Sequence, residues 1–357
     1  MATLSSILHS MRASYPPNPA FTEKDLPDLS GKVYIITGAT SGVGEQLTSI
    51  LYSQHATIYL GARSSTKAQT AIQKIQVAHP SSTGTLHHLP LDLSDLSTIS
   101  SSVHSFLNTE SRLDVLFNNA GVMVPPQGSV TKQGYELQLG TNCVAPFLLT
   151  KLLTPVLERT AEKEKEKGAV RVVWVSSSAA EVGSPAGGVD LGNLDYKVDV
   201  GRQVKYAVSK AGNWYHAVEF ARRYRESGVV SVPVTCSFIH SFILSHCMQN
   251  PTNPTPNIKA LNPGNLKTEL QRHVPGWLNM AFNLILYDAK FGAYTELFAG
   301  LSPDVTLEKT GSWIQPWGRF VPIRADLEAG AKPESEGGTG IAHKFWEWSE
   351  EQVREYC

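Results

Sequence analysis

Tyr206 and Lys210 lie four positions apart in a stretch whose apolar spacing predicts a helix, Val204 to Ser227. That spacing puts both side chains on one face of the helix. A free tyrosine has a pKa of about 10, and an ammonium about 4 Å away lowers the pKa of a phenol by at most roughly three units. The pair is therefore predicted to donate or accept a proton near neutral pH.

A glycine-rich segment, Thr37 to Gly44, follows a predicted strand and opens a predicted helix. Its first glycine permits a sharp turn, and the next two remove side chains where backbone approaches a pyrophosphate. The free N–H groups of the helix N-terminus favour a bound anion. This context predicts a dinucleotide-binding loop. The residues expected to contact the cofactor are Gly38, Ser41, Gly42, Val43 and Gly44.

The second predicted strand ends in Leu60-Gly61-Ala62-Arg63. NAD-selective enzymes of this type carry an acid near this point, which holds the ribose 2′-hydroxyl. Here Ala62 takes that place, and the guanidinium of Arg63 suits a 2′-phosphate. Lys67, one helical turn further on, adds positive charge. The sequence therefore predicts NADP(H) rather than NAD(H).

Strands and helices alternate along the chain, and the strands are continuous apolar runs. This pattern predicts an α/β fold, a single Rossmann-type doubly wound parallel sheet with helices on both faces. The predicted strands are Lys32–Thr37, Ala56–Leu60, Thr85–Leu91, Leu113–Phe117 and Ala169–Ser176, and Val229–Val234 begins a sixth. The predicted helices are Gly44–Gln54, Ser65–Ala78, Ser94–Asn108, Gly134–Arg159 and Val204–Ser227.

These motifs, in this order, resemble the short-chain dehydrogenase/reductase family over roughly residues 30–320. The resemblance implies transfer of a hydride between a nicotinamide cofactor and a carbonyl or alcohol, with Tyr206 as general acid/base. It also implies that Lys210 binds the nicotinamide ribose. The long interval between Ser177 and Tyr206, with Leu194-Asp195 inside it, resembles the retinol-dehydrogenase-like branch, including its fungal members. In that case the extra loop is expected over an apolar substrate pocket.

Further site residues follow from the resemblance alone. Asn142 matches an asparagine that interrupts a helix and holds a proton-relaying water, although a purely structural asparagine is the alternative. One serine of Ser176, Ser177 and Ser178 is expected to bond the substrate oxygen; Ser177 is favoured and Ser178 comes second. The implied cofactor contacts are Asp92, Leu93, Asn119, Ala120, Gly121, Pro263, Gly264, Leu266 and Thr268.

The chain departs from the family at about residues 233–256, between the sixth strand and Pro263. This segment is interpreted either as a genuine surface insertion or as translated intron sequence. If it replaces the end of the strand, the nicotinamide side of the site is damaged. The predicted organisation is an N-terminal extension at 1–29, the Rossmann domain at 30–322, and a tail at 323–357. Within the tail, residues 325–340 are predicted as a mobile loop and His343–Tyr356 as a short helix.

Composition excludes several classes of function. The net charge of the 357 residues is −1, which argues against nucleic acid as a partner. The four cysteines lack metal-ligand or disulfide spacing, so no metal is expected. No apolar run is long enough to span a membrane, and the N-terminus lacks a secretory signal, so a cytoplasmic location is expected. The predicted partner is a small apolar carbonyl or alcohol, with a possible homodimer. The alternative is a non-catalytic NADP-binding regulatory protein.

Overall fold

The computed structural model describes residues 17–235 and 287–357, and within them one sheet forms the centre of the molecule. Its strands are ordered β3-β2-β1-β4-β5-β6-β7-β8, and every neighbouring pair is parallel except β7 and β8. The strands are β1 (Val33–Thr37), β2 (Thr57–Ala62), β3 (Thr85–Pro90), β4 (Val115–Asn118), β5 (Arg171–Ser176), β6 (Val230–Thr235), β7 (Ile314–Gln315) and β8 (Arg319–Phe320).

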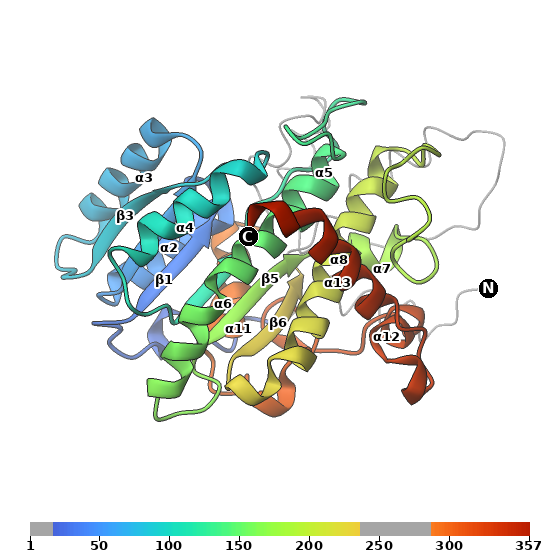
Figure 1. The fold of residues 1–357 in the computed structure, drawn as a ribbon. Helices are drawn as coiled ribbons and strands as arrows, with labels where there is room; N and C mark the ends of the chain where they lie inside the picture. Colours follow the sequence, from blue (N-terminus) through green and yellow to red (C-terminus); the bar gives the residue numbers. More distant parts are fainter. Residues whose placement is uncertain (1–16, 236–286) are drawn as a thin grey trace.

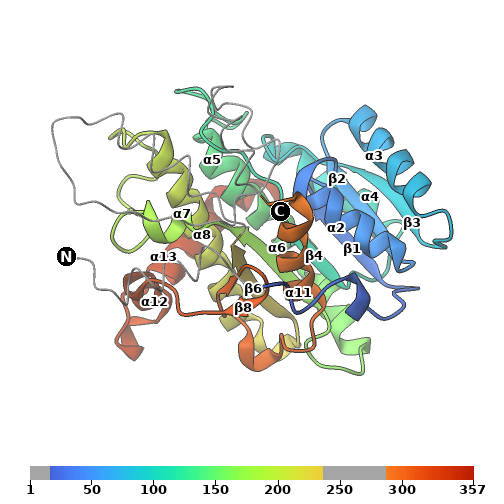
Figure 2. The ribbon, with the colours of Figure 1, turned by 180° about the vertical axis from the view of Figure 1, so that it is seen from behind.

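Helices cover both faces of the sheet (Figures 1 and 2). The predicted doubly wound Rossmann-type fold is confirmed. The longer helices are α2 (Gly42–Ser53), α3 (Ser65–Ala78), α4 (Ile99–Leu107), α6 (Ala145–Lys163), α8 (Arg202–Arg223), α11 (Ala289–Leu301) and α13 (Ile341–Val353). The shorter ones are α5 (Leu137–Leu139), a π-helical turn η3 (Gly140–Val144), α7 (Ala179–Val182) and α12 (Ala325–Ala331).

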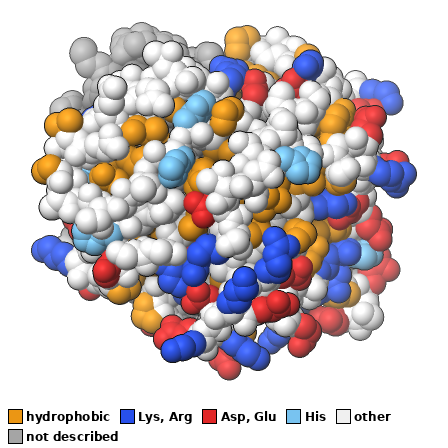
Figure 3. All heavy atoms as spheres, turned by 60° about the vertical axis from the view of Figure 1, so that its left-hand side comes forward, with side chains coloured by type: hydrophobic (Ala, Val, Ile, Leu, Met, Phe, Trp, Pro, Cys, Tyr) orange, Lys and Arg blue, Asp and Glu red, His pale blue; other side chains and the backbone are white. Residues whose placement is uncertain are grey.

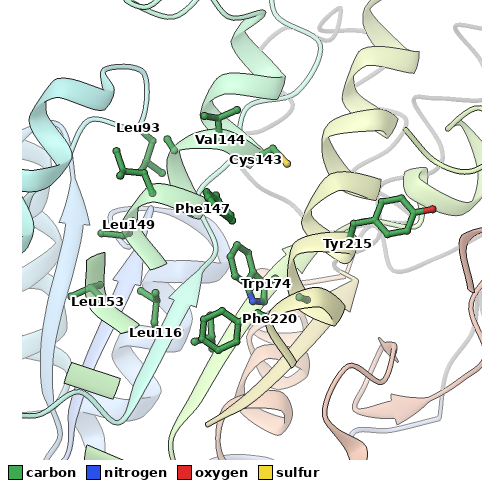
Figure 4. Packing of buried hydrophobic residues seen from close by; sticks show 14 of the residues in the cluster. Leu93, Leu116, Cys143, Val144, Phe147, Leu149, Leu153, Trp174, Tyr215 and Phe220 are labelled. Carbon is green, nitrogen blue, oxygen red and sulfur yellow. The ribbon is translucent and has the colours of Figure 1, made fainter. Parts of the chain in front are cut away.

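Two apolar clusters fill the space between the sheet and its helices. One packs side chains of α2, α3 and α11 against one face. The other packs α4, α6, α8 and α13 against the opposite face and includes Trp174, Phe147 and Phe220 (Figure 4). Burial on both faces explains why the inner strands are continuous apolar runs, whereas edge strand β3 alternates between exposed and covered positions.

The strand order reverses between β1 and β4, which are neighbours although β2 and β3 lie between them in the chain. In open α/β sheets, ligands bind beyond the carboxyl ends of the strands at such a switch point. The loop after β1 and the loop after β4 meet at this place. Both carry motifs singled out in the sequence.

Two sequence predictions differ from the structure. The helical region predicted at 134–159 is not uniform, because α5 gives way to the π-helical turn before α6 begins at Ala145. The mobile loop predicted at 325–340 is wrong in its first half: residues 325–331 form α12, whose Leu327 is buried. The predicted terminal helix is confirmed as α13, and its Trp346 is buried in the core rather than presented for binding.

Candidate active site

The glycine-rich loop connects β1 to the N-terminus of α2. Gly38 and Gly42 have φ of +70° and +58°, a region that side chains disfavour. A Cβ on Gly44 would lie 2.6 Å from both Asn119 Nδ2 and Gly38 O, so only glycine fits there. Ser41 caps α2 in an extended conformation without a side-chain bond to the helix, and Val43 is buried beneath the loop. The loop thus leaves helix N–H groups facing outward without side chains in the way.

The loop after β4 supports the glycine-rich loop from the side. Asn119 Nδ2 donates to Thr37 O at 2.7 Å, and Ala120 N donates to Thr37 Oγ1 at 2.9 Å. A Cβ on Gly121 would lie 3.4 Å from Lys210 Nζ, so the loop after β4 passes directly beside the lysine. Thr37 was missed at the sequence level. Its position as the last residue of β1, directly before the first glycine, is the signal that marks it.

Arg63 and Lys67 follow β2 and are both exposed. Lys67 lies in the first turn of α3, where its backbone N–H donates to Ser64 Oγ at 3.3 Å. Ala62, the residue before Arg63, is buried and carries no charge. Two exposed cations therefore follow the carboxyl end of β2, and the residue before the guanidinium is the uncharged Ala62 rather than an acid.

Asp92 and Leu93 follow β3, but their side chains have local roles. One oxygen of Asp92 accepts from Ser94 N at 2.9 Å and from Ser94 Oγ at 2.6 Å. Leu93 points into the apolar core (Figure 4). A contact between Leu93 and a cofactor would therefore run through its backbone.

Tyr206 and Lys210 lie on the buried side of α8 and are 2% and 3% exposed. Lys210 Nζ lies 5.9 Å from the centroid of the Tyr206 ring and donates to Val175 O in β5 at 2.8 Å. Asn213, one turn beyond Lys210, donates to the same carbonyl at 3.1 Å. Asn213 was missed from the sequence; its spacing of three from the lysine places it on the same helix face. The structure thus brings the predicted pair together at the end of β5.

The adjacent serines after β5 have different partners. Ser176 Oγ donates to Lys210 O at 2.6 Å, which ties α8 to the end of the strand. Ser177 Oγ accepts from Ala179 N at 3.1 Å in the turn that starts α7. Ser178 caps α7 and is buried. The hydroxyl of Ser176 is thus committed to a contact with the helix backbone, and Ser177 and Ser178 stay as the candidates.

Asn142 lies within the π-helical turn η3 and is fully buried. Its Oδ1 accepts from Val122 N at 2.7 Å, and its Nδ2 donates to Val122 O at 2.9 Å and to Ser209 Oγ at 3.1 Å. These bonds use both donors and one acceptor of the amide, so they hold the turn against the loop after β4 and against α8.

Four predicted cofactor contacts, Pro263, Gly264, Leu266 and Thr268, lie outside the described residues, as does the segment from 236 to 256. Residues 233–235, the start of the predicted insertion, belong to β6, which pairs with β5 and β7. The sixth strand is thus confirmed.

Known proteins resemble this chain along its whole length. The family model for short chain dehydrogenases matches residues 32–189. A short-chain dehydrogenase/reductase of Phomopsis amygdali is 50% identical over 360 residues, which cover 99% of each protein. The short-chain dehydrogenase/reductase pkfC of Emericella nidulans is 45% identical and covers 95% of this chain and 97% of its own. The chain belongs to the short-chain dehydrogenase/reductase family. It is therefore an oxidoreductase of that family.

Solved structures share the short-chain dehydrogenase/reductase fold. An uncharacterized protein from Mycobacterium Paratuberculosis superposes with a TM-score of 0.62 at 25% identity, covering 94% of this chain and 97% of its own. A complex of Pseudomonas aeruginosa RhlG with NADP gives 0.58 at 18% identity, with coverage of 85% and 99%. A Brucella melitensis 3-ketoacyl-(acyl-carrier-protein) reductase with NADH gives 0.55 at 18% identity, with coverage of 80% and 96%. The last two bear on the fold alone.

The site fits the nicotinamide dinucleotide that this family binds. Neither Gly38 nor Gly44 has room for a Cβ, and the loop between them stands at the N-terminus of α2 at the switch point of the sheet. Within residues 17–235 and 287–357, no group of His, Cys, Asp and Glu side chains is arranged to hold a metal ion. Over the same residues, no helix is both long and apolar enough to cross a membrane.

Proposed function

We propose that this short-chain dehydrogenase/reductase interconverts a carbonyl and an alcohol with NADP(H), and that Tyr206 is its general acid/base. The observation that carries the proposal is the position of Lys210, a buried ammonium 5.9 Å from the centre of the Tyr206 ring. A cation so close favours the phenolate, which allows the phenol to give up its proton. The ammonium also lies beside Gly121, in the loop after β4 that bonds to the end of β1.

The bound cofactor supplies or accepts the hydride. In the direction of reduction, the Tyr206 hydroxyl protonates the substrate oxygen as its carbon gains the hydride, and the reverse reaction returns that proton to the phenolate. Ser177 is proposed to donate a hydrogen bond to the same oxygen, with Ser178 as the alternative. Lys210 stabilises the phenolate and binds the ribose hydroxyls. Asn142 is proposed to hold, through its backbone carbonyl, the water that returns a proton to Lys210.

The preference for NADP(H) rests on Arg63 and Lys67. Both side chains are exposed after β2, and the buried Ala62 replaces the acid that would repel a 2′-phosphate. Solved neighbours include one complex with NADP and one with NADH, so the fold alone does not choose between them. A guanidinium binds phosphate in bidentate fashion, which favours the phosphorylated cofactor.

The proposal also covers the substrate class, the assembly and the cellular location. The substrate is proposed to be a small or medium apolar ketone, aldehyde or alcohol. A homodimer across α8 would include α13, because α13 covers the outer side of that helix. A cytoplasmic location agrees with the free thiols of Cys143 and Cys357.

A panel assay tests the proposal. NADPH consumption is measured with ketones and aldehydes of increasing size, and each product is identified by mass spectrometry. Turnover that disappears in Tyr206→Phe supports the proposed reaction. NADPH binding without turnover on any member of the panel favours instead a non-catalytic NADP-binding regulatory protein. Similar catalytic efficiency with NADH and NADPH would overturn the cofactor preference.

A further inference from the structure

The C-terminal helix α13 lies across α8 and reaches the π-helical turn that contains Asn142 (Figure 1). Gly212 of α8 makes this approach possible. A Cβ on Gly212 would lie 2.5 Å from Cys143 Sγ in the turn and 3.0 Å from Phe345 Cε1 in α13. Trp346 of α13 packs edge-to-face on Phe147 of α6, with 4.8 Å between ring centroids. The π-helical turn and α13 therefore both approach α8 at the position of one missing side chain.

A buried chain of hydrogen bonds runs through this junction. Cys143 Sγ lies 3.7 Å from His216 Nδ1, and His216 Nε2 lies 2.8 Å from Ser349 Oγ. Ser349 Oγ in turn donates to Phe345 O at 2.8 Å. Cys143, His216 and Ser349 are each 0% exposed. Figure 4 shows Cys143 directed from its turn toward α8, the helix that carries His216.

The contact between Ser349 and Phe345 O determines which atoms donate and which accept along these hydrogen bonds. Because the Ser349 hydroxyl gives its hydrogen to Phe345 O, the oxygen receives the hydrogen of His216 Nε2. Nδ1 is then left as the acceptor for the Cys143 thiol. Burial raises the pKa of the Cys143 thiol and lowers the pKa of His216 to about 3, so the thiol keeps its proton and the imidazole is neutral. Only in this arrangement do the thiol, the imidazole N–H and the serine hydroxyl each donate to a partner.

This series of hydrogen bonds ends at Cys143, the residue next to Asn142. Cys143 and Asn142 share the turn η3, a wide π-helical geometry that isolated helices rarely adopt. Asn142 binds the turn to Val122 and Ser209 on one side, and Cys143 binds it to His216 on the other. Glu219, further along α8, accepts from Arg222 and Arg223, and its Oε1 lies 3.2 Å from Nδ1 of His343 in α13. The position of the turn therefore depends on how α13 is docked.

We propose that Cys143, His216 and Ser349 form a positioning relay through which α13 holds the π-helical turn and sets the place of the Asn142 backbone carbonyl. The three residues touch neither substrate nor cofactor in this scheme. They act through Asn142, and the inference rests on the proposed function for its effect on turnover. Small displacements of a positioned group cost up to about 100-fold in rate, which makes such a relay consequential.

Two matched pairs of variants test the relay. Cys143→Ala and Cys143→Ser both remove the sulfur, but only the serine keeps a donor for His216 Nδ1. Ser349→Ala breaks the link to His216, whereas Val353→Ala removes a buried apolar group from the same helix and leaves the hydrogen bonds intact. For each variant, kcat, the KM for NADPH, and backbone hydrogen exchange of residues 140–144 are measured.

The expected result is a split between the members of each pair. Cys143→Ala and Ser349→Ala lower kcat about ten-fold, change the KM for NADPH less than about two-fold, and speed exchange in the turn. Cys143→Ser and Val353→Ala keep kcat within about two-fold of wild type. Equal losses within each pair, or unchanged kcat and exchange in all four, would overturn the relay. A wild-type protein without turnover contradicts the proposed function instead, and the exchange data still decide on the relay.

Discussion

The two sides of the site are built by opposite means. On the proposed cofactor side, Gly38 and Gly44 leave no room for a Cβ, which would lie 3.0 Å from Ala120 Cα or 2.6 Å from Gly38 O. On the catalytic side, buried polar groups do the positioning: Ser176 bonds Lys210 O, and Asn142 bonds Ser209. The first side is thus vulnerable to an added carbon atom, and the second to a removed polar atom. The contrast explains why the cofactor side can be recognised in the sequence by its closely spaced glycines, whereas the polar residues of the other side are scattered along the chain.

Removing the Tyr206 hydroxyl should have the largest effect. Tyr206→Phe takes away the proton donor, and general acid–base catalysis supplies about 10²- to 10⁴-fold in rate. We expect kcat to fall about 1,000-fold while the Kd for NADPH stays within about three-fold, because the ring still packs in the core. Steady-state kinetics and fluorescence titration of NADPH measure the two quantities. Residual activity above one tenth of wild type would refute the assignment.

Adding one carbon to the glycine-rich loop comes next. In Gly44→Ala, the new Cβ would meet Asn119 Nδ2 and Gly38 O at 2.6 Å, so the two loops must separate. We expect NADPH to bind about 100-fold more weakly, in line with the cost of misplacing a binding group by about 1 Å. Isothermal titration measures the affinity. Gly192→Ala is the control, because its Cβ would lie no closer than 3.4 Å to a neighbouring atom. Equal affinity in the two variants would contradict a cofactor site at this loop.

Removing the Arg63 guanidinium after β2 should change the preference for NADPH over NADH rather than abolish turnover. Charge-assisted hydrogen bonds contribute about 1.5–3 kcal/mol, so Arg63→Ala should lower kcat/KM for NADPH about 10- to 100-fold and leave that for NADH nearly unchanged. Arg225→Ala is the matched control, since Arg225 is also exposed but lies just before β6, at the amino ends of the strands rather than at their carboxyl ends. Parallel losses with both cofactors would show that Arg63 does not select between them.

The smallest expected effect is the contribution of His216 to the pH dependence of the free energy of unfolding. Burial lowers the pKa of His216 to about 3, below its ordinary value of 6.5. The neutral ring therefore stabilises the fold fully above pH 6.5, and this contribution is lost as the pH falls toward 3. Between pH 7 and pH 5 the loss is about 2 kcal/mol, and His216→Phe should remove that part of the pH dependence.

Urea unfolding at the two pH values measures this difference directly. The exposed His104 of α4 offers a control, because His104→Gln should keep the wild-type pH dependence. If His216→Phe lost as much stability on acidification as wild type, the buried ring would not be the source of the effect. The comparison uses the change between pH values, so a different absolute stability of the variant does not confuse it.

The sequence was informative where function depends on local geometry. The glycines at 38, 42 and 44, the alternation of strands with helices, and the Tyr206–Lys210 spacing each have one physical interpretation in their context. The family and the Rossmann-type sheet are accordingly confirmed. Helix limits were less accurate: α2 begins at Gly42 rather than Gly44, because the turn and the first helical residues share the same glycines.

Other features depend on contacts that no local pattern encodes. The π-helical turn has the same apolar content as the helix around it, so periodicity does not mark it. Residues 325–331 have one large apolar side chain, Leu327, and two residues of α12 are buried only because α8 and α13 lie beside them. Three adjacent serines are chemically equivalent in the sequence, and only the contact between Ser176 and Lys210 O distinguishes the first from the others.

Gly212 is the position of α8 at which the π-helical turn and α13 both make contact. Its missing side chain is filled by Cys143 from one direction and by Phe345 from the other. A relative that lacked a helix equivalent to α13 would have no ring to accommodate there, and selection against larger residues at this position would relax. Glycine at position 212, a small residue at 143 and an aromatic residue at 345 should therefore change together among relatives of this chain.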